Sequence, residues 1–343
     1  MGACQLRILI VTDAWKPQVN GVVRTLEYLA CELVGMGHEV CYATPEGHPT
    51  VPLPTYPEIR VALFPRSRLL KTFEEFSPDA IHVATEGPLG FAARAICRHK
   101  RWRFTTSFHT RFPEYVHARF PAIPEPLVYA ILRRFHAAAA VTMVATPSLK
   151  RDLETHGFTN LALWSRGVDI EQYSPGRRMP VADFLPDAPR PLFLFVGRIA
   201  VEKNVEAFLK LDLPGTKLIV GEGPQRPELQ ARFAQARFLG QKTGDELAGI
   251  YASSDVFVFP SRTDTFGLVL LEALASGTPV AAYPVSGPID VVGTAGIGAL
   301  AENLGQAALQ ALAIQRDSCR RFAEANSWRA SAEQFTNNLA LTR

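Results

Sequence analysis

The feature that most constrains the fold is an alternation of short apolar runs with helical patterns. Runs rich in Ile, Leu, Val and Phe, such as 7–11, 192–196 and 256–259, alternate with patterns of helical period, such as 21–36 and 267–276. Strands that are apolar at every position are typical of sheets covered on both faces. Strands that alternate with helices are typical of parallel sheets. The pattern therefore predicts an α/β protein.

The length and a division of the pattern predict two domains. A chain of 343 residues is long enough for about two domains of roughly 150 residues each. The alternation falls into two series that meet near 165–175. We therefore expect two doubly wound parallel-sheet domains, over 1–165 and 166–322, and a final helical segment over 323–343.

Proline and the last residues give two further expectations. Proline clusters at 45–65, 113–126 and 175–193, and such clusters are typical of loops. The stretch 303–341 has a mostly helical pattern, and Asn-Ser-Trp at 326–328 predicts a break between two helices.

Composition excludes several classes of protein. The net charge of +3 argues against a nucleic-acid-binding protein. The five cysteines form no Cys-x-x-Cys pair, so we expect a protein of the reducing cytoplasm without a disulfide framework or a zinc site. No run reaches the 18 or so apolar residues that a membrane span needs, and the apolar start at 7–11 is too short for a signal peptide.

Two cations follow the strand expected at 192–196. Ligands of open α/β sheets bind beyond the carboxyl ends of the strands, and Arg198 and Lys203 stand there. An arginine fork and a lysine point charge could together hold a diphosphate. A surface salt bridge of Lys203 with Glu202 or Glu206 is the alternative interpretation.

The turn after 256–259 carries the most informative residues. Asp264 lies in this loop, and Glu272 lies about 7 Å along the helix that follows, at roughly 1.5 Å per residue. That distance suits a nucleotide held by its phosphate at the helix start and by its ribose hydroxyls at the carboxylate. The amides that would meet the phosphate are those of Phe266, Gly267 and Leu268. The alternative is a solvated Glu272, although its neighbours are apolar.

The N-terminal half offers further candidates at strand ends. Gly21 opens a helix after the first strand, where its amide could approach an anion, or it could be a plain loop glycine. His109 and Arg111 follow the strand at 104–107, and Glu86 follows the strand at 80–83. A lone histidine is more often structural, so both interpretations of His109 stay open.

The sequence has no pattern typical of a metal or of a common cofactor. It lacks an Asp-x-Asp triplet, a His/Cys/Asp/Glu cluster with metal-ligand spacing and a Walker A loop. The Gly-x-Gly-x-x-Gly fingerprint of a nicotinamide-dependent oxidoreductase is also missing. We expect no cofactor, and side-chain cations would stabilise a departing diphosphate.

Several motifs together resemble a known family. PQVNGVVRT at 17–25, FVGRIAVEKN at 195–204 and PSRTDTFGLVLLEALASGTPV at 260–280 carry the resemblance, with support from 166–169 and 221–224. The chain resembles the retaining GT-B glycosyltransferases of family 4. Within that family it is similar to bacterial lipid mannosyltransferases and to enzymes of the sulfoquinovosyl-diacylglycerol type.

The resemblance implies an architecture and a set of roles. It implies two Rossmann-like domains with an interdomain cleft, a donor nucleotide on the C-terminal domain, and a final helix that returns to the N-terminal domain. The roles that it implies are diphosphate binding by Arg198 and Lys203, donor-sugar contact by Asp264, phosphate contact by the amides of Phe266, Gly267 and Leu268, ribose binding by Glu272, proximity of His109 to the sugar, and a Gly21 loop that faces the diphosphate.

The chain departs from the family pattern at two positions. The first acid of the Glu-x7-Glu signature is Asp264, which is one methylene shorter than glutamate and therefore reaches less far toward the sugar. The N-terminal loop has Asn20-Gly21 where many members have Gly-Gly.

The implied reaction is transfer of a hexose with retention, by front-face attack, to a lipid or glycolipid acceptor bound by the N-terminal domain. Mannose from GDP-mannose is the expected donor; alternatives are a UDP-sugar with a lipid or soluble saccharide acceptor, and a non-catalytic nucleotide-sugar-binding protein. Glu86 and Arg111 are the acceptor-side candidates. Basic residues mixed with apolar ones at 66–73 and 94–103 predict contact with the anionic inner face of the cytoplasmic membrane, or else ordinary basic helix faces.

Overall fold

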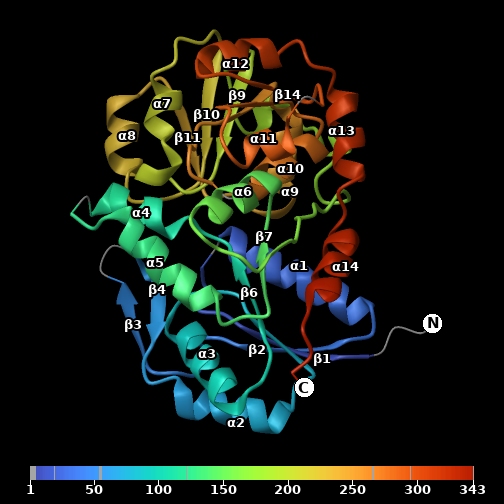
Figure 1. Ribbon diagram of the computed structural model, residues 1–343. Coiled ribbons are helices and arrows are strands. Elements are labelled where there is room, and N and C mark those ends of the chain that lie inside the picture. The colour runs from blue at the N-terminus through green and yellow to red at the C-terminus, as the bar shows by residue number, and fades with distance from the viewer. Residues whose placement is uncertain are drawn as a thin grey trace. The chain divides into compact units, whose positions relative to one another are not determined.

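The computed structural model describes residues 5–18, 20–53, 56–120, 122–264, 266–293 and 295–342 (Figure 1). The chain divides into two compact units. Unit 1 contains Met1–Ser165 and Trp328–Arg343, and unit 2 contains Arg166–Ser327. Each unit is built around its own parallel sheet, as the alternating sequence pattern predicts.

Unit 1 holds a six-stranded parallel sheet in the order β2-β1-β5-β6-β7-β8. The strands are β1 (Arg7–Val11), β2 (Glu39–Ala43), β5 (Ala80–Val83), β6 (Thr105–Phe108), β7 (Val141–Val144) and β8 (Leu161–Leu163), beside an antiparallel pair of β3 (Thr50–Leu53) and β4 (Tyr56–Ala62). The helices are α1 (Gly21–Gly35), α2 (Arg66–Phe76), α3 (Pro88–Lys100), α4 (Phe112–Arg119), α5 (Glu125–His136), α6 (Pro147–Thr155) and α14 (Trp328–Asn338).

Successive side chains of β1 enter two different cores. Leu9 and Val11 join a cluster with α2 and α3, whereas Ile8 and Ile10 join a cluster with α1 and α14. The helices α1 and α14 lie side by side, although they come from opposite ends of the chain (Figure 1). From Ile8 to Val11 the strand β1 is buried on both faces, which explains why these four residues are all apolar.

Unit 2 holds a second six-stranded parallel sheet in the order β11-β10-β9-β12-β13-β14. The strands are β9 (Leu192–Val196), β10 (Thr216–Val220), β11 (Arg237–Gly240), β12 (Val256–Phe259), β13 (Val280–Ala282) and β14 (Gly298–Leu300). The helices are α7 (Val205–Leu209), α8 (Arg226–Arg232), α9 (Gly244–Ser253), α10 (Leu268–Ala275), α11 (Pro288–Val291), α12 (Leu304–Ala311) and α13 (Arg316–Glu324), with short 3-10 turns η1 (Pro175–Arg177), η2 (Val181–Asp183) and η3 (Val201–Lys203).

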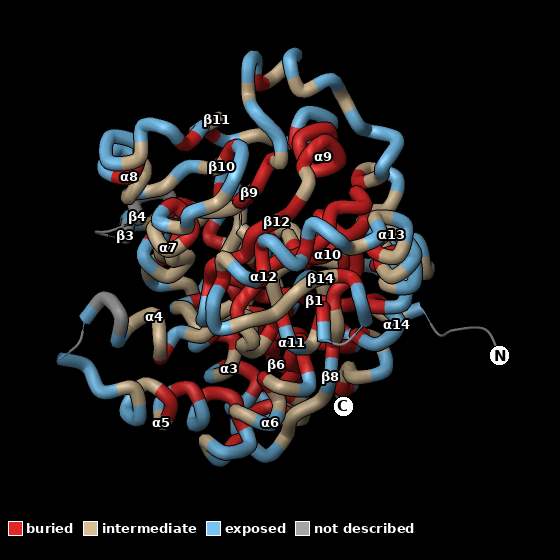
Figure 2. The backbone as a smooth tube through the Cα atoms, turned by 90° about the horizontal axis from the view of Figure 1, so that it is seen from above, coloured by how far each residue is buried: buried red, intermediate tan, exposed pale blue. Residues whose placement is uncertain are grey.

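The sheet of unit 2 is also covered on both faces. Leu192 and Leu194 of β9 face a core formed with α9, α10 and α13, and Phe193 and Phe195 face a core formed with α7, α8 and α12. Figure 2 shows β9, β12, α9 and α10 as the buried centre of this unit, with the exposed backbone around them.

The strand orders locate one switch point in each unit. In unit 2 the chain winds outward from β9 toward β11 and then, on the other side, from β12 toward β14. In unit 1 the corresponding pair is β1 and β5. Loops diverge at the carboxyl ends of such a pair and leave the crevice in which open α/β sheets bind ligands.

The sequence expectations held for most of the buried strands and failed in two of the three proline-rich stretches. The strands at 7–11, 80–83, 192–196 and 256–259 are confirmed to the residue, whereas the strand expected at 104–107 lies one residue later. The break expected at 326–328 is confirmed in position, since α13 ends at Glu324 and α14 begins at Trp328. The loop expected at 45–65 is wrong, because most of it forms the β3–β4 pair. The loop expected at 113–126 is also wrong in part, because α4 accepts a proline in its first turn, where a missing N–H costs nothing.

A glycine at the end of β10 gives a test of the unit 2 turns. Gly221 has φ of 143°, and a Cβ there would lie 1.9 Å from the carbonyl oxygen of Gly197. We expect Gly221→Ala to lower the free energy of unfolding by about 2 kcal/mol or more, since backbone must move. Gly244→Ala is the matched control: its φ is 57° with nothing within 4 Å, so only about 1–2 kcal/mol of conformational cost applies. Equal losses in urea titrations would contradict the close approach.

Candidate active site

The switch point of unit 2 brings together a lysine and an aspartate from two loops. Lys203 ends the turn η3 that follows β9, and Asp264 lies in the loop that follows β12. The Nζ atom of Lys203 lies 2.6 Å from Oδ1 and 2.7 Å from Oδ2 of Asp264. Their side chains are 23% and 14% exposed. The loops after β9 and β12 therefore meet at this switch point, and the two charges neutralise each other.

Further hydrogen bonds join the same two loops. The side-chain amide of Asn204 donates to the carbonyl oxygen of Pro260 at 3.1 Å. The hydroxyl of Ser261 donates to the carbonyl oxygen of Glu202 at 3.2 Å. These bonds fix the loops on either side of the Lys203–Asp264 pair. Arg198, half-buried two residues after β9, adds a second cation to the same turn.

Glu272 lies on α10 and is buried. Its residue is 5% exposed, so the alternative of a solvated glutamate is wrong. Its Oε2 accepts a hydrogen bond of 3.0 Å from the hydroxyl of Tyr251 on α9. Gly267 precedes α10 with φ of 83°, and Phe266 and Leu268 on either side are half-buried. The helix α10 therefore begins directly after the loop that carries Asp264, as expected.

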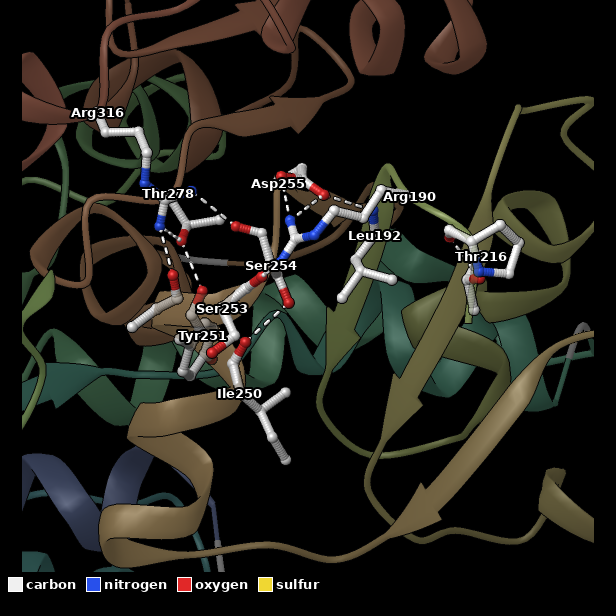
Figure 3. Close-up of polar contacts among 12 residues, drawn as sticks. Arg190, Leu192, Thr216, Ile250, Tyr251, Ser253, Ser254, Asp255, Thr278 and Arg316 are labelled. Carbon is white, nitrogen blue, oxygen red and sulfur yellow. Dashed lines mark hydrogen bonds and ion pairs between the residues drawn. The ribbon is translucent and has the colours of Figure 1, made fainter. Parts of the chain in front are cut away.

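The backbone at Tyr251, the partner of Glu272, accepts hydrogen bonds from other residues of unit 2. The hydroxyl of Thr278 donates to the carbonyl oxygen of Tyr251 at 2.6 Å. Arg316 donates to that Thr278 hydroxyl at 3.2 Å and to the carbonyl oxygen of Ala252 at 2.6 Å (Figure 3). The side chain of Tyr251 is fully buried, and its hydroxyl, held in place by that packing, orients the carboxylate of Glu272.

The switch point of unit 1 is organised by Asp13, directly after β1. Its carboxylate accepts hydrogen bonds from the amides of Leu89 at 2.9 Å and Gly90 at 3.2 Å, and from the hydroxyl of Thr85 at 3.0 Å. Burial raises the pKa of the Asp13 carboxyl, and the two amide bonds oppose that shift. A Cβ at Gly87 would lie 2.3 Å from Cγ of Asp13. The loops after β1 and β5 are therefore joined by hydrogen bonds to this carboxylate.

The departure at Asn20 has a structural reason. Oδ1 of Asn20 accepts hydrogen bonds of 3.0 Å from the amides of Val22 and of Val23, which caps α1. Asparagine is among the strongest helix N-caps, whereas glycine offers no side-chain acceptor. Two of the amides at this helix start are thus already engaged. The role of Gly21 toward a diphosphate stays a prediction, and the contact would come from the backbone of Gly21 itself.

The side chain of Glu86 makes a buried contact with His136. Its Oε1 lies 3.0 Å from Nε2 of His136, and their side chains are 4% and 0% exposed. The other ring nitrogen of His136 lies 2.9 Å from the hydroxyl of Thr106 in β6. The structure therefore places Glu86 at the expected strand end with one oxygen bonded inward, and an acceptor role stays a prediction.

Arg111 and His109 lie on the same loop after β6 but have separate neighbours. Nη1 of Arg111 lies 2.6 Å from Glu114 and 2.7 Å from Asp152, so it links α4 to α6. The ring of His109 meets the ring of Trp164 edge-on, at 5.6 Å between centroids. Glu86, His109 and Arg111 are thus all at strand ends of unit 1, but the contacts described do not join them in one cluster.

The basic segments expected at a membrane direct their apolar residues inward. Leu69 and Phe73 of α2 are buried, and so are Ile96 and Cys97 of α3. These segments therefore present mainly cations to solvent, as the alternative of ordinary basic helix faces predicts. Among the described residues, no helix combines the length and the apolar character that crossing a bilayer requires.

Three residues at the switch points were not predicted. Asp13 could have been found, because it directly follows a buried strand. Tyr251 and His136 carry no such signal, since each lies within a helix and meets its carboxylate through tertiary packing alone.

Comparison with known proteins agrees with this architecture. Residues 19–172 match Glycosyltransferase Family 4, and residues 190–316 match Glycosyl transferases group 1. A sucrose-phosphate synthase from Thermosynechococcus elongatus has a similar structure, with a TM-score of 0.77 at 20% identity over 96% of this chain and 97% of that one. The chain therefore has the GT-B fold that the motifs indicated.

Curated relatives share the sequence more closely. A GDP-mannose-dependent alpha-mannosyltransferase of Mycobacterium tuberculosis is 31% identical over 84% of this chain and 82% of its own length. The sulfoquinovosyl transferase of Arabidopsis thaliana is 33% identical over 82% of this chain, but the match spans only 58% of that longer protein. An alpha-monoglucosyldiacylglycerol synthase of Streptococcus pneumoniae is 27% identical over 96% of this chain and 83% of its own length. The chain belongs to the family 4, group 1 glycosyltransferases.

Proposed function

We propose that the chain is a retaining glycosyltransferase that moves mannose from GDP-mannose to a membrane lipid or glycolipid. The observation that carries the proposal is the meeting of Lys203 and Asp264 at the switch point of unit 2, in a chain that is similar to GDP-mannose-dependent enzymes over most of its length. A cation and a carboxylate at one crevice suit a diphosphate joined to a polyhydroxylated sugar.

The donor would bind to unit 2 by its charged and hydroxylated parts. Arg198 and Lys203 would hold the diphosphate, together with the amides at the start of α10. Glu272, oriented by Tyr251, would accept hydrogen bonds from the ribose hydroxyls. Asp264 would accept from a hydroxyl of the sugar. The helix-start residues proposed for the phosphate are Phe266, Gly267 and Leu268.

The reaction exchanges one bond at the anomeric carbon. The bond to the diphosphate oxygen breaks while the acceptor oxygen attacks from the same face, and the acceptor proton passes to the departing diphosphate. Charge grows on the diphosphate as it departs, and Arg198 and Lys203 would stabilise that charge in the transition state. We also propose that His109 contacts the sugar and Gly21 the diphosphate, and that Glu86 and Arg111 contact the acceptor.

The acceptor proposal draws support from relatives whose names include lipids. The pneumococcal relative is a synthase of a glucosyldiacylglycerol and matches nearly this whole chain. A lipid acceptor lies in a membrane, so we propose that the protein works at the anionic inner face of the cytoplasmic membrane as a peripheral protein.

Nucleotide release from a panel of GDP- and UDP-sugars tests the proposal. The panel is measured with and without vesicles that contain phosphatidylglycerol and diacylglycerol. We expect release from GDP-mannose, raised severalfold or more by the vesicles, and an α-linked mannolipid as the product. Release from a UDP-sugar alone would replace the donor, and a β-linked product would refute retention. Donor binding without release under any condition would contradict the lipid assignment. Preference for a soluble saccharide over a lipid as the acceptor would also contradict it.

A further inference from the structure

A series of buried hydrogen bonds ends at Glu86, in the loop that follows β5. Nε2 of His136 on α5 lies 3.0 Å from Oε1 of Glu86, and Nδ1 lies 2.9 Å from the hydroxyl of Thr106 on β6. That hydroxyl lies 3.0 Å from the hydroxyl of Thr142 on β7. The side chains of His136 and Glu86 are 0% and 4% exposed, and both threonines are fully buried. The series therefore connects one carboxylate to a helix and to two strands of the sheet.

The carboxylate of Glu86 gives this series a direction. A carboxylate only accepts hydrogen bonds, so Nε2 of His136 carries a proton and donates to Oε1 of Glu86. In the neutral imidazole, Nδ1 then accepts from the hydroxyl of Thr106, which in turn accepts from the hydroxyl of Thr142. Donors that are linked in this way polarise and strengthen one another. The two threonines thereby favour the tautomer of His136 that can hold Glu86.

The second oxygen of Glu86 distinguishes this residue from Asp13, the carboxylate on the loop after β1. The two oxygens of Asp13 accept hydrogen bonds of 2.9 Å, 3.2 Å and 3.0 Å from the loop after β5 and the start of α3, so both are engaged. In Glu86, Oε1 accepts from His136, but Oε2 meets no hydrogen-bond donor among the residues that the structure describes. A nearly buried carboxylate oxygen without a donor is unfavourable, because it has lost most of its water. A hydroxyl group of a ligand would supply the missing donor.

The negative charge of Glu86 also acts on Asp13. Burial, and to a lesser extent the charge of Glu86, raises the pKa of the Asp13 carboxyl, against the hydrogen bonds that lower it. Two carboxylates that interact in this way repel an anionic group, whereas a carboxylate oxygen accepts hydrogen bonds from hydroxyl groups. The ligand group that suits Oε2 of Glu86 is therefore an uncharged hydroxyl, such as those of sugars and of glycerol.

A purely structural role explains less of this arrangement. The helix α5 is already held against the sheet, because Phe135 lies in one core cluster with Ile81 and Val83 of β5. Arg94 of α3 also donates to the carbonyl oxygen of Phe135 at 2.9 Å. A buried pair of ionisable side chains adds little to such packing, since apolar residues of similar volume often replace it without loss of stability. The packing also gives no reason for an oxygen of Glu86 that lacks a donor.

We propose that His136 is a positioning residue for acceptor binding, which holds Oε1 of Glu86 so that Oε2 accepts a hydrogen bond from an acceptor hydroxyl. This role rests on the proposed function, which places Glu86 on the acceptor side. It adds the atom that makes the contact, the kind of group that is contacted and the residue behind it. His136 is fully buried and acts only through Glu86. A carboxylate that is fixed before the acceptor arrives loses less conformational entropy on binding.

Acceptor kinetics of substituted proteins test this role. His136→Leu removes both ring nitrogens, and we expect the acceptor KM to rise about tenfold, with kcat and the donor KM changed less than about twofold. His136→Gln retains an amide that can donate to Glu86, so it should restore much of the loss. Thr106→Val removes only the hydroxyl behind the ring and should raise the acceptor KM about threefold. Glu86→Gln should raise it about tenfold or more, and His136→Leu should add no further rise in that background, because both act through one contact.

His82 provides a matched control. It is also a fully buried histidine, and its ring nitrogens lie 3.0 Å from the hydroxyl of Thr105 and 3.1 Å from that of Ser107. We expect His82→Gln to lower the temperature of unfolding as His136→Gln does, but to leave the acceptor KM as in the parent. Equal rises in the acceptor KM for the two glutamine variants would overturn the positioning role. A parent-like acceptor KM in both His136→Leu and Thr106→Val would overturn it as well.

Nitrogen-15 NMR of the eight histidines tests the hydrogen bond without turnover, even where His136→Leu fails to fold. The signals of His136 are assigned by their loss in His136→Gln. We expect a proton on Nε2, and a proton on Nδ1 alone would overturn the hold on Glu86 whatever the reaction. Failure of the proposed function gives a different result. No transfer from any donor of the panel would refute that function and this role with it, whereas transfer with an acceptor KM that only Glu86→Gln changes would refute this role alone.

Discussion

Replacing Lys203 by alanine is expected to lower kcat/KM for the donor about a hundredfold or more, since one charge-stabilising donor to a departing group contributes that much. The substitution also removes the ammonium group that lies 2.6 Å and 2.7 Å from the two oxygens of a carboxylate that is only 14% exposed. Loss of that partner from Asp264 adds an unfavourable charge beside an incoming diphosphate. Steady-state kinetics with the donor that the panel identifies measures the effect.

Substitution of Asp264 is expected to change the affinity for the nucleoside diphosphate in the opposite direction from substitution of Lys203. Asp264→Asn retains the shape but no longer competes with the diphosphate for the ammonium of Lys203. We therefore expect the affinity for the nucleoside diphosphate to stay or rise in Asp264→Asn and to fall in Lys203→Ala, as measured by titration calorimetry. Turnover should fall in both, because the sugar loses an acceptor in one case and the leaving group loses a cation in the other.

A double variant and a surface control make this result decisive. If Lys203 acts only by holding Asp264, then Lys203→Ala in the Asp264→Asn background will cost nothing further, which would contradict direct contact with the diphosphate. Lys210→Ala is the control, because that lysine bonds to Glu206 at 2.8 Å and its side chain is mostly exposed. An exposed pair of this kind contributes little, so kinetics as in the parent are expected.

The parts of this site that sequence could predict are those that the sheet dictates. The buried strands β9 and β12 are apolar at every position, so they could be located from composition alone. Strands that neighbour each other at a switch point send their loops to one crevice, and Lys203 and Asp264 therefore meet across 61 residues of sequence. Their direct ion pair was not predicted, because the diphosphate and the sugar were taken as their partners.

The unit 1 candidates show why the rest could not be predicted. Glu86 follows a strand as expected, but its bond to His136 joins residues 50 positions apart through the packing of α5. Sequence spacing carries no record of which helix face meets which strand end. The same limit applies to 66–73 and 94–103, where composition indicated a membrane surface but burial of the apolar residues on α2 and α3 could be known only from the fold.

Glu272→Gln is expected to raise the donor KM about tenfold to a hundredfold with a smaller change in kcat, since hydrogen bonds to a charged acceptor contribute about 1.5–3 kcal/mol. Tyr251→Phe should raise the same KM by a factor of roughly two to ten, because it removes one neutral donor and leaves the carboxylate less well oriented. Tyr173→Phe removes a hydroxyl from a second buried tyrosine of the same core cluster, and we expect a KM as in the parent.

Donor analogues that lack a ribose hydroxyl separate a ribose contact from a structural role. The parent protein should lose affinity for the 2′-deoxy or the 3′-deoxy nucleotide, whereas Glu272→Gln should show a much smaller further loss, because its partner is already weakened. If the parent and Glu272→Gln lose equal affinity when the hydroxyl is removed, the carboxylate does not bind the ribose. Its hydrogen bond to Tyr251 would then serve only to join α9 to α10, and the urea midpoint, not the KM, would be the quantity that both substitutions change.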